Sequence, residues 1–131
     1  DIAVGSEDFG AREFGIHDPV ETIAELRRYG VSMAGVTLGH RGSLVDWGDG
    51  VRRFRAVDVP VVDTTGAGDI YHAALAYGAL RDMSPSDTVT FASIAASLSC
   101  RSLGARAAIP TLNEIAEIRR REGSLETDHA L

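Results

Sequence analysis

The stretch that most constrains the fold is Val61-Val62-Asp63-Thr64-Thr65-Gly66-Ala67-Gly68-Asp69. Its two valines are typical of the end of a buried strand, a glycine-rich turn follows, and the small residues of 70–80 indicate a helix. Such a turn can direct backbone N–H groups at an anion, because the first N–H donors of a helix have no acceptor within it. Asp69 does not suit a simple phosphate site, because its charge would repel the anion. Its place there suggests proton chemistry instead.

Alternating strand and helix patterns predict a layered α/β sheet. The clearest helix starts are Asp18-Pro19, a capping residue before a proline, and the capping box Thr111-Leu112-Asn113-Glu114. A helix between the first two strands favours a right-handed parallel crossover. We therefore expect strands at 1–5, at 33–38 and in a hairpin over 43–57, a short helix before Gly15, and further helices at 18–29, 67–81, 85–102 and 112–121.

Composition limits the class of protein. The 131 residues are enough for one domain, which we place at 1–121, with 122–131 as a polar, frayed tail. The net charge of −6 argues against a nucleic-acid partner, which needs a clustered basic surface. No apolar run approaches the roughly 20 residues that span a bilayer, so we expect no membrane partner.

The cysteine content and the first residues bear on the compartment. The single cysteine, Cys100, permits no internal disulfide, so nothing demands an oxidising environment. The start, Asp1-Ile2-Ala3-Val4-Gly5, is not a signal peptide and looks like a strand already in progress. We therefore expect a cytoplasmic protein, and a chain that is a piece of a longer one.

The glycine turn lacks the features of several common nucleotide and hydrolase motifs. The dinucleotide fingerprint needs a third glycine where Tyr71 stands, and the chain has neither a Walker-type loop nor a G-x-S-x-G hydrolase turn. The four histidines lack the spacing of metal ligands; they are His17, His40, His72 and His129. We expect His72 to pack beneath the glycine turn.

The full string Asp63-Thr64-Thr65-Gly66-Ala67-Gly68-Asp69 resembles the C-terminal signature of the ribokinase-like (PfkB) carbohydrate kinases. Thr37-Leu38-Gly39-His40-Arg41-Gly42 resembles the family's T-x-G-x-x-G turn at the ATP phosphates, and 104–110 resembles the segment after the nucleotide-binding helix. The resemblance covers 1–121. It implies a three-layer Rossmann-like (ribokinase-like) sheet with flanking helices, truncated at its N-terminal side.

The resemblance also implies the reaction, in which ATP with Mg²⁺ phosphorylates a sugar hydroxyl. Asp69 is then the catalytic base, and the turn of Gly66, Ala67 and Gly68 is the anion hole, formed by the N–H groups of Ala67, Gly68 and Asp69. Without the resemblance, Asp69 would be an ordinary acid at a helix N-terminus. The residues implied for cofactor binding are Thr37, Gly39, Arg41, Gly42 and Gly104.

Two places bear on metal ions. Asp63 and Thr65 resemble the family's monovalent-cation positions, with K⁺ the candidate ion; they can equally be a turn-stabilising pair, and Ala108 stands where some potassium-dependent relatives have a serine. The family's N-x-x-E pattern falls on Ser6-Glu7-Asp8-Phe9, which lacks both the Asn and the Glu. Glu7 can substitute as a magnesium ligand, or be only the first-turn acid of a short helix.

We therefore expect the ATP-binding and catalytic-base half of a sugar kinase, with little activity alone because most sugar contacts of the family come from an N-terminal part. The sequence does not name the sugar. The alternative is a non-catalytic module that binds nucleotide, or associates as a homodimer or with another chain through an exposed apolar face.

Overall fold

The computed structural model describes residues 1–127 and divides them into two compact units, where the sequence predicted one domain. The first unit comprises Asp1–Arg55 together with Thr127, and the second comprises Ala56–Glu126. Each unit is described by itself. Within residues 1–127 no helix has the length and apolar character needed to cross a membrane.

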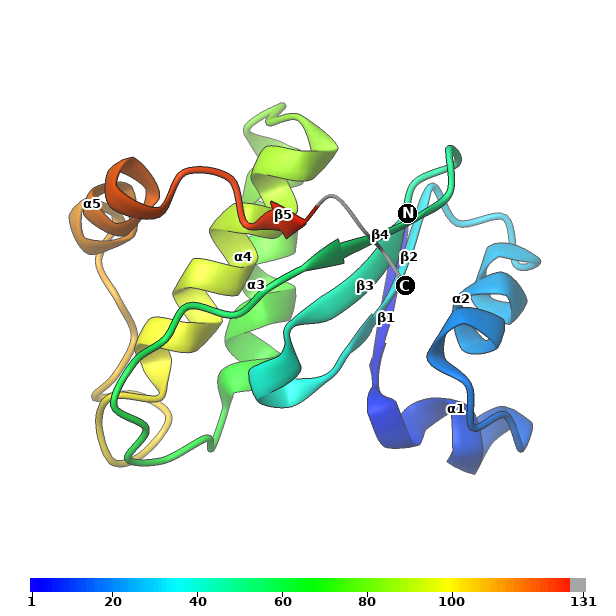
Figure 1. Cartoon of the computed structure of the whole chain (residues 1–131), viewed down its shortest axis with the longest axis horizontal. Coiled ribbons are helices and arrows are strands. Elements are labelled where there is room, and N and C mark those ends of the chain that lie inside the picture. The colour runs from blue at the N-terminus through cyan, green and yellow to red at the C-terminus, as the bar shows by residue number, and fades with distance from the viewer. Residues whose placement is uncertain (128–131) are drawn as a thin grey trace. The chain divides into compact units, whose positions relative to one another are not determined.

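The first unit contains β1 to β4 of a mixed sheet whose strand order is β1-β2-β3-β4-β5 (Figure 1). The strands β1 and β2 are parallel, with Ser6 beside Thr37 at their carboxyl ends, as the crossover rule predicts. The pairs β2–β3 and β3–β4 are antiparallel, which confirms the expected hairpin. The strands are β1 (Ile2–Ser6), β2 (Met33–Thr37), β3 (Ser43–Asp46), β4 (Val51–Phe54) and β5 (Glu126–Thr127).

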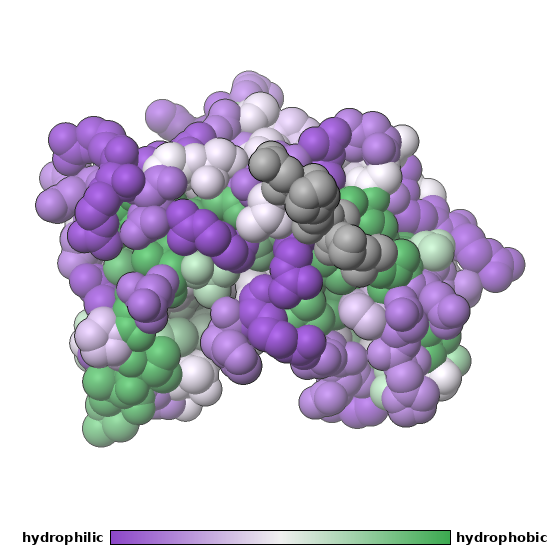
Figure 2. Space-filling view, viewed as in Figure 1, coloured by the Kyte–Doolittle hydropathy of each residue, from purple (hydrophilic) through white to green (hydrophobic). Residues whose placement is uncertain are grey.

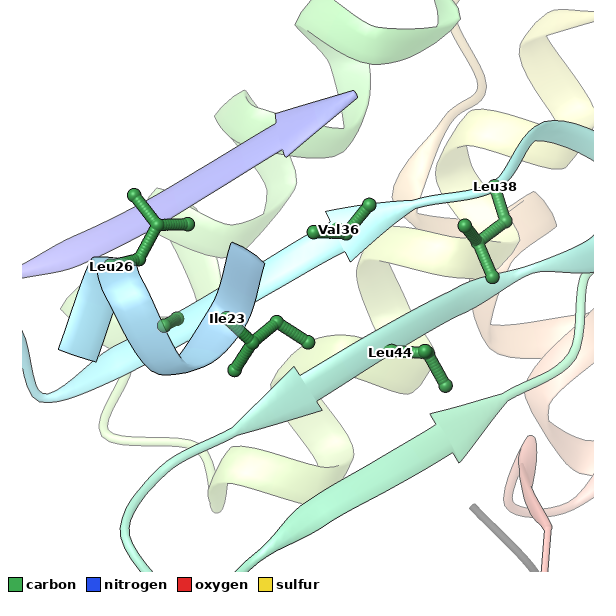
Figure 3. Packing of buried hydrophobic residues seen from close by; sticks show 6 residues of the cluster. Ile23, Leu26, Val36, Leu38 and Leu44 are labelled. Carbon is green, nitrogen blue, oxygen red and sulfur yellow. The ribbon is translucent and has the colours of Figure 1, made fainter. Parts of the chain in front are cut away.

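Two helices pack against β1 and β2 of this sheet: α1 (Glu7–Phe14) and α2 (Pro19–Arg27). The Asp18 carboxylate caps α2 by accepting the N–H groups of Val20 and Glu21 at 2.8 and 3.0 Å. Leucine, isoleucine and valine side chains of α2, β2 and β3 meet between the helix and the sheet, as Figure 3 shows. Burial of this apolar face is what holds the parallel strands and the turns at their carboxyl ends in place.

The second unit consists mainly of three helices: α3 (Ala67–Leu80), α4 (Pro85–Ser99) and α5 (Leu112–Glu122). The helices α3 and α4 pack side by side (Figure 1). Gly78 permits this approach, because a Cβ there would lie 2.7 Å from Cγ2 of Thr88. Ser84 caps α4, and Thr111 with Glu114 forms the predicted capping box of α5.

Some predicted boundaries were wrong. Val61 and Val62 form no strand and are 62% and 59% exposed, so the glycine turn follows an irregular segment. The predicted frayed tail is ordered over 122–127: α5 includes Glu122, and Leu125 is fully buried, with its N–H donated to Thr90 Oγ1 at 3.4 Å. The rest of that tail, 128–131, lies outside the described residues.

Candidate functional site

The glycine turn of the second unit is organised by the Asp63 carboxylate. Its Oδ1 accepts the backbone N–H and the hydroxyl of Thr65 at 2.9 and 2.7 Å, and its Oδ2 accepts the backbone N–H of Gly104 at 2.9 Å. The backbone N–H groups of Val62 and Asp63 both donate to the carbonyl oxygen of Cys100, at 2.8 and 3.2 Å. The turn is thereby tied to the loop that follows α4.

Both the backbone conformation and the close neighbours of position 66 require a glycine. Its φ is +80°, which disfavours other residues, and a Cβ there would lie 2.7 Å from Cβ of Ala105. Gly104 also has a positive φ, +81°, but a Cβ there would meet nothing within 4 Å. The two loops therefore touch at Gly66 and Ala105, a contact that the sequence did not predict.

The first turn of α3 carries three of the predicted site residues. The N–H of Ala67 already donates to the carbonyl oxygen of Thr64 at 3.1 Å, which differs from its expected role as an anion donor. The N–H groups of Gly68 and Asp69 have no acceptor within the helix, because they belong to its first turn, and no side chain caps them. A Cβ on Gly68 would meet nothing within 4 Å, so an anion can approach these two donors.

The Asp69 carboxylate lies at this helix start, exposed to solvent. Over residues 1–127 it makes no side-chain hydrogen bond or ion pair, whereas some other first-turn acids do, such as Asp87, which contacts Arg119 at 2.7 Å. An acid that caps a helix or balances a nearby cation has a structural partner. Asp69 is instead available to a ligand.

His72 follows Asp69 by about one helical turn and is exposed rather than packed beneath the site. Its Nδ1 lies 2.7 Å from the carbonyl oxygen of Gly68. Because the side chain is exposed, the prediction of a buried histidine was wrong.

The second set of predicted residues lies in the first unit, in the turn after β2. This turn is a 3₁₀ segment, Gly39–Arg41, closed by the N–H of Leu38 donating to the carbonyl oxygen of Gly42 at 2.8 Å. Gly42 has φ +90°, and a Cβ there would lie 1.9 Å from the carbonyl oxygen of Phe54, so only glycine fits. Gly39 has φ +61° and open space where a Cβ would be. Thr37 donates its hydroxyl to the Gly5 carbonyl oxygen at 3.4 Å.

Arg41 of this turn forms an ion pair with Glu7, between Nη2 and Oε1. Glu7 is the first residue of α1 and follows β1, so the two charged side chains come from the carboxyl ends of adjacent parallel strands. Phe9, at the position where the family pattern has its Glu, packs against the hydrophobic cluster, with its ring centroid 5.5 Å from that of Phe14. Glu7 is thus the carboxylate of this segment that faces the turn.

Electrostatics and donor sets bear on the cations expected at these places. The Thr65 hydroxyl, followed by the N–H groups of Thr65 and Gly104, lowers the pKa of the Asp63 carboxyl. A carboxylate accepts about four hydrogen bonds, so these three leave Asp63 little capacity for K⁺. Among residues 1–127 no three His, Cys, Asp or Glu side chains cluster as metal ligands; His129 lies outside them. Magnesium needs less, because one carboxylate together with nucleotide phosphates commonly holds it.

Large apolar side chains are exposed around the glycine turn. Figure 2 shows an apolar area at its lower left, where Figure 1 places the segment before α3 and the loop between α4 and α5. The exposed residues of these segments are Val61, Val62, Leu103 and Ile109, and Leu112 at the start of α5 is also exposed. An apolar surface beside a candidate anion site suits a ligand that has both a flat apolar part and a phosphate.

Comparison with known proteins gives one family for this arrangement. The sequence profile described as pfkB family carbohydrate kinase matches residues 1–112 and so includes both units. The chain is 39% identical to the ribokinase of Lactococcus lactis over 80 residues, which are 61% of this chain and 27% of that protein.

Solved structures give the same result. A putative ribokinase from Agrobacterium tumefaciens superimposes with a TM-score of 0.84 at 31% identity, over 92% of this chain and 40% of that chain. The Arabidopsis thaliana ribokinase complexed with ribose and ATP superimposes with a TM-score of 0.82 at 29% identity, over 90% of this chain and 40% of that chain. The chain therefore spans less than half the length of these similar proteins.

Proposed function

The chain belongs to the pfkB family of carbohydrate kinases, and from this premise we propose that it supplies the ATP-binding and catalytic-base half of a sugar kinase. Its fold is the ribokinase-like α/β fold, a mixed sheet with helices, as the sequence predicted. The observation that carries the proposal is the exposed Asp69 carboxylate, without a structural partner among residues 1–127, beside the open space at Gly68.

In this proposal Asp69 accepts the proton of a sugar hydroxyl while the hydroxyl oxygen bonds to the γ-phosphorus of ATP. The bond from that phosphorus to the bridging oxygen breaks, and ADP leaves with the electron pair. Phosphoryl transfer demands mainly positioning and charge stabilisation. A well-placed general base contributes roughly 10²–10⁴-fold in rate.

The N–H groups of Gly68 and Asp69 stabilise the charge on the transferring phosphoryl oxygens. One such donor contributes about 2.7–4 kcal/mol in comparable oxyanion sites. Gly66 supports them by allowing the tight turn, and Ala67 joins only by giving up its bond to Thr64. In the first unit, Thr37, Gly39, Arg41 and Gly42 are assigned to the ATP phosphates, and Gly104 in the second unit is assigned to the nucleotide.

Two cation roles follow from the donor sets. Magnesium, when bound, neutralises charge on the nucleotide phosphates, and Glu7 is the residue assigned to hold it, directly or through water. We assign the Asp63 and Thr65 side chains to stabilising the turn; the alternative is that they bind K⁺. The hydrogen bonds of Asp63 favour the first of these.

A second candidate function is a non-catalytic module that binds nucleotide or a protein partner. The observation that favours it is the apolar surface around the turn, where Leu103 is 75% exposed and Ile109 is 59% exposed. Such a surface would also support a homodimer. Both candidates place nucleotide at the same turns, so turnover is what separates them.

The test compares this chain with the full-length protein that contains it. Each is incubated with ATP, Mg²⁺ and a panel of sugars, and ADP formation is followed. We expect the full-length protein to phosphorylate at least one sugar and this chain to have little activity, because most sugar contacts of the family lie in an N-terminal part. Turnover by neither protein, with nucleotide binding retained, would support the module instead.

A further inference from the structure

The Arg41–Glu7 ion pair joins a charged residue of the turn after β2 to one of the turn after β1. Arg41 belongs to the 3₁₀ turn after β2 and Glu7 begins α1 after β1. About half of each side chain is exposed, 47% for Arg41 and 49% for Glu7. The pair is therefore accessible to a dissolved anion.

Separately from the side-chain pair with Glu7, hydrogen bonds of its own hold the backbone around Arg41. Its N–H donates to the Leu38 carbonyl oxygen at 3.2 Å, and its own carbonyl oxygen accepts from Nη2 of Arg53 at 3.3 Å. The guanidinium is held at its end by Glu7. Release of the guanidinium from Glu7 therefore breaks none of the hydrogen bonds of the Arg41 backbone.

The guanidinium suits a phosphate as well as it suits a carboxylate. Its planar N–H donors match either anion in a bidentate geometry, and a phosphate carries the larger charge. Glu7 remains favourably placed when Arg41 leaves it, because the N-terminus of α1 stabilises a negative charge. Transfer of the Arg41 guanidinium from the Glu7 carboxylate to a phosphate therefore costs little free energy for either side chain.

We infer that Glu7 is an internal competitor for Arg41, and that the nucleotide phosphates bind by displacing the Glu7 carboxylate from the guanidinium. The inference rests on the proposed function, because it assumes that Arg41 faces the phosphates. Glu7 then acts as a positioning residue: it holds Arg41 extended over the turn before binding and reduces the affinity for phosphate. An exposed ion pair of ordinary strength keeps the guanidinium engaged for most of the time.

The test is calorimetry on this chain, without divalent metal, using ADP, inorganic pyrophosphate and adenosine as probes. Glu7→Gln is expected to bind ADP and pyrophosphate about two- to six-fold more tightly than the unmodified chain, the gain from freeing an arginine held by an exposed pair. The gain should shrink as salt rises, because salt screens the pair. Adenosine, which has no phosphate, should bind equally to both.

Two further variants separate competition from a general change in charge. Glu25→Gln removes the same charge from another ion pair of the first unit, in which Glu25 lies 3.1 Å from Arg28. This variant should leave the affinities for ADP and pyrophosphate unchanged. In an Arg41→Gln background, Glu7→Gln should have no effect on affinity. Glu7→Gln is a mild change for folding, because the side chain is half exposed.

An unchanged or weaker affinity of Glu7→Gln for ADP and pyrophosphate overturns the inference. A gain that persists in the Arg41→Gln background, or appears equally in Glu25→Gln, also overturns it. Absence of binding for every phosphate probe overturns it regardless of turnover. The proposed function fails separately, when the full-length protein phosphorylates no sugar although the competition effect is present.

Discussion

The Asp63 carboxylate accepts the backbone N–H of Gly104 at 2.9 Å, across 41 residues of sequence. The same carboxylate also holds the Thr65 hydroxyl and N–H, so it joins the turn before α3 to the loop after α4. Gly66 and Ala105 touch beside it. The glycine turn is therefore shaped by a second loop, and the Asp63 carboxylate helps to connect the two.

The pH dependence of this connection can be predicted. The pKa of Asp63 is lowered in the folded state, mainly by the Thr65 hydroxyl. Ionised Asp63 therefore stabilises the folded state fully when the pH is above 3.8, the ordinary pKa of the group. That stabilisation is lost as the pH falls through the folded pKa. We expect the amide resonances of Thr65 and Gly104 to shift together in an NMR titration, with a shared midpoint below 3.8. A midpoint at or above that value, or separate midpoints, would show that the bonds are not formed in solution.

Dependence on potassium is expected to be absent. Both oxygens of the Asp63 carboxylate are already bonded within the protein, and Ala108 offers no hydroxyl as a further ligand. Sugar phosphorylation by the full-length protein should therefore run at the same rate in potassium and in choline buffers of equal ionic strength. A rate that rises with K⁺ alone would assign Asp63 and Thr65 to the cation instead.

The two glycines of the turn should respond differently to alanine. Gly66→Ala introduces a Cβ 2.7 Å from that of Ala105 at φ +80°, which should destabilise the protein by about 1–3 kcal/mol. Gly68→Ala places its Cβ in open space within α3, where alanine is favoured by about 0.5–1 kcal/mol. The new methyl group nevertheless occupies space beside the Gly68 and Asp69 N–H groups that an anion would enter, so we expect phosphate affinity to fall.

Urea denaturation and pyrophosphate calorimetry on both variants check these expectations. Equal loss of stability in Gly66→Ala and Gly68→Ala would contradict the contact of Gly66 with Ala105. Unchanged pyrophosphate affinity in Gly68→Ala would remove the Gly68 and Asp69 N–H groups from the phosphate site.

The helix caps provide a matched pair of stability predictions. Thr111 caps α5 by accepting the N–H of Glu114 at 3.2 Å, so Thr111→Ala should lower the free energy of unfolding by about 0.5–2 kcal/mol. Ser6 stands at the same position of α1 but makes no capping hydrogen bond through its side chain. Ser6→Ala should therefore have an effect within about 0.5 kcal/mol. A larger loss for Ser6→Ala than for Thr111→Ala in urea denaturation would contradict these cap assignments.

Much of the fold could be predicted because its signals are local. The proline after Asp18 and the capping box at Thr111 each mark a helix start through contacts within four residues, and the structure confirms both. The parallel pairing of β1 and β2 followed from the helical crossover between them. The turn glycines were recognised from a continuous string, and Gly42 is confirmed as a position that only glycine fits.

The parts that failed depend on contacts distant in sequence. The Cys100 carbonyl oxygen holds Val62 in an irregular segment, and a backbone acceptor has no side-chain signature in a sequence. Leu125 is buried and its N–H donates to Thr90 of α4, which the polar composition of 122–131 did not indicate. The Arg41–Glu7 pair joins residues 34 apart in the sequence, so the pattern of neither turn indicates the other as its partner.

The most direct measurement of the central claim is the turnover number of the full-length protein for sugar phosphorylation, with Asp69→Asn as the variant. The exposed Asp69 side chain makes the substitution mild for folding, while loss of a general base should lower kcat by roughly 10²–10⁴-fold. The matched control is Asp87→Asn, which removes the first-turn acid of α4 and its contact with Arg119 and should leave kcat nearly unchanged. Retention of the original kcat by Asp69→Asn, or an equal loss in Asp87→Asn, would contradict Asp69 as the catalytic base.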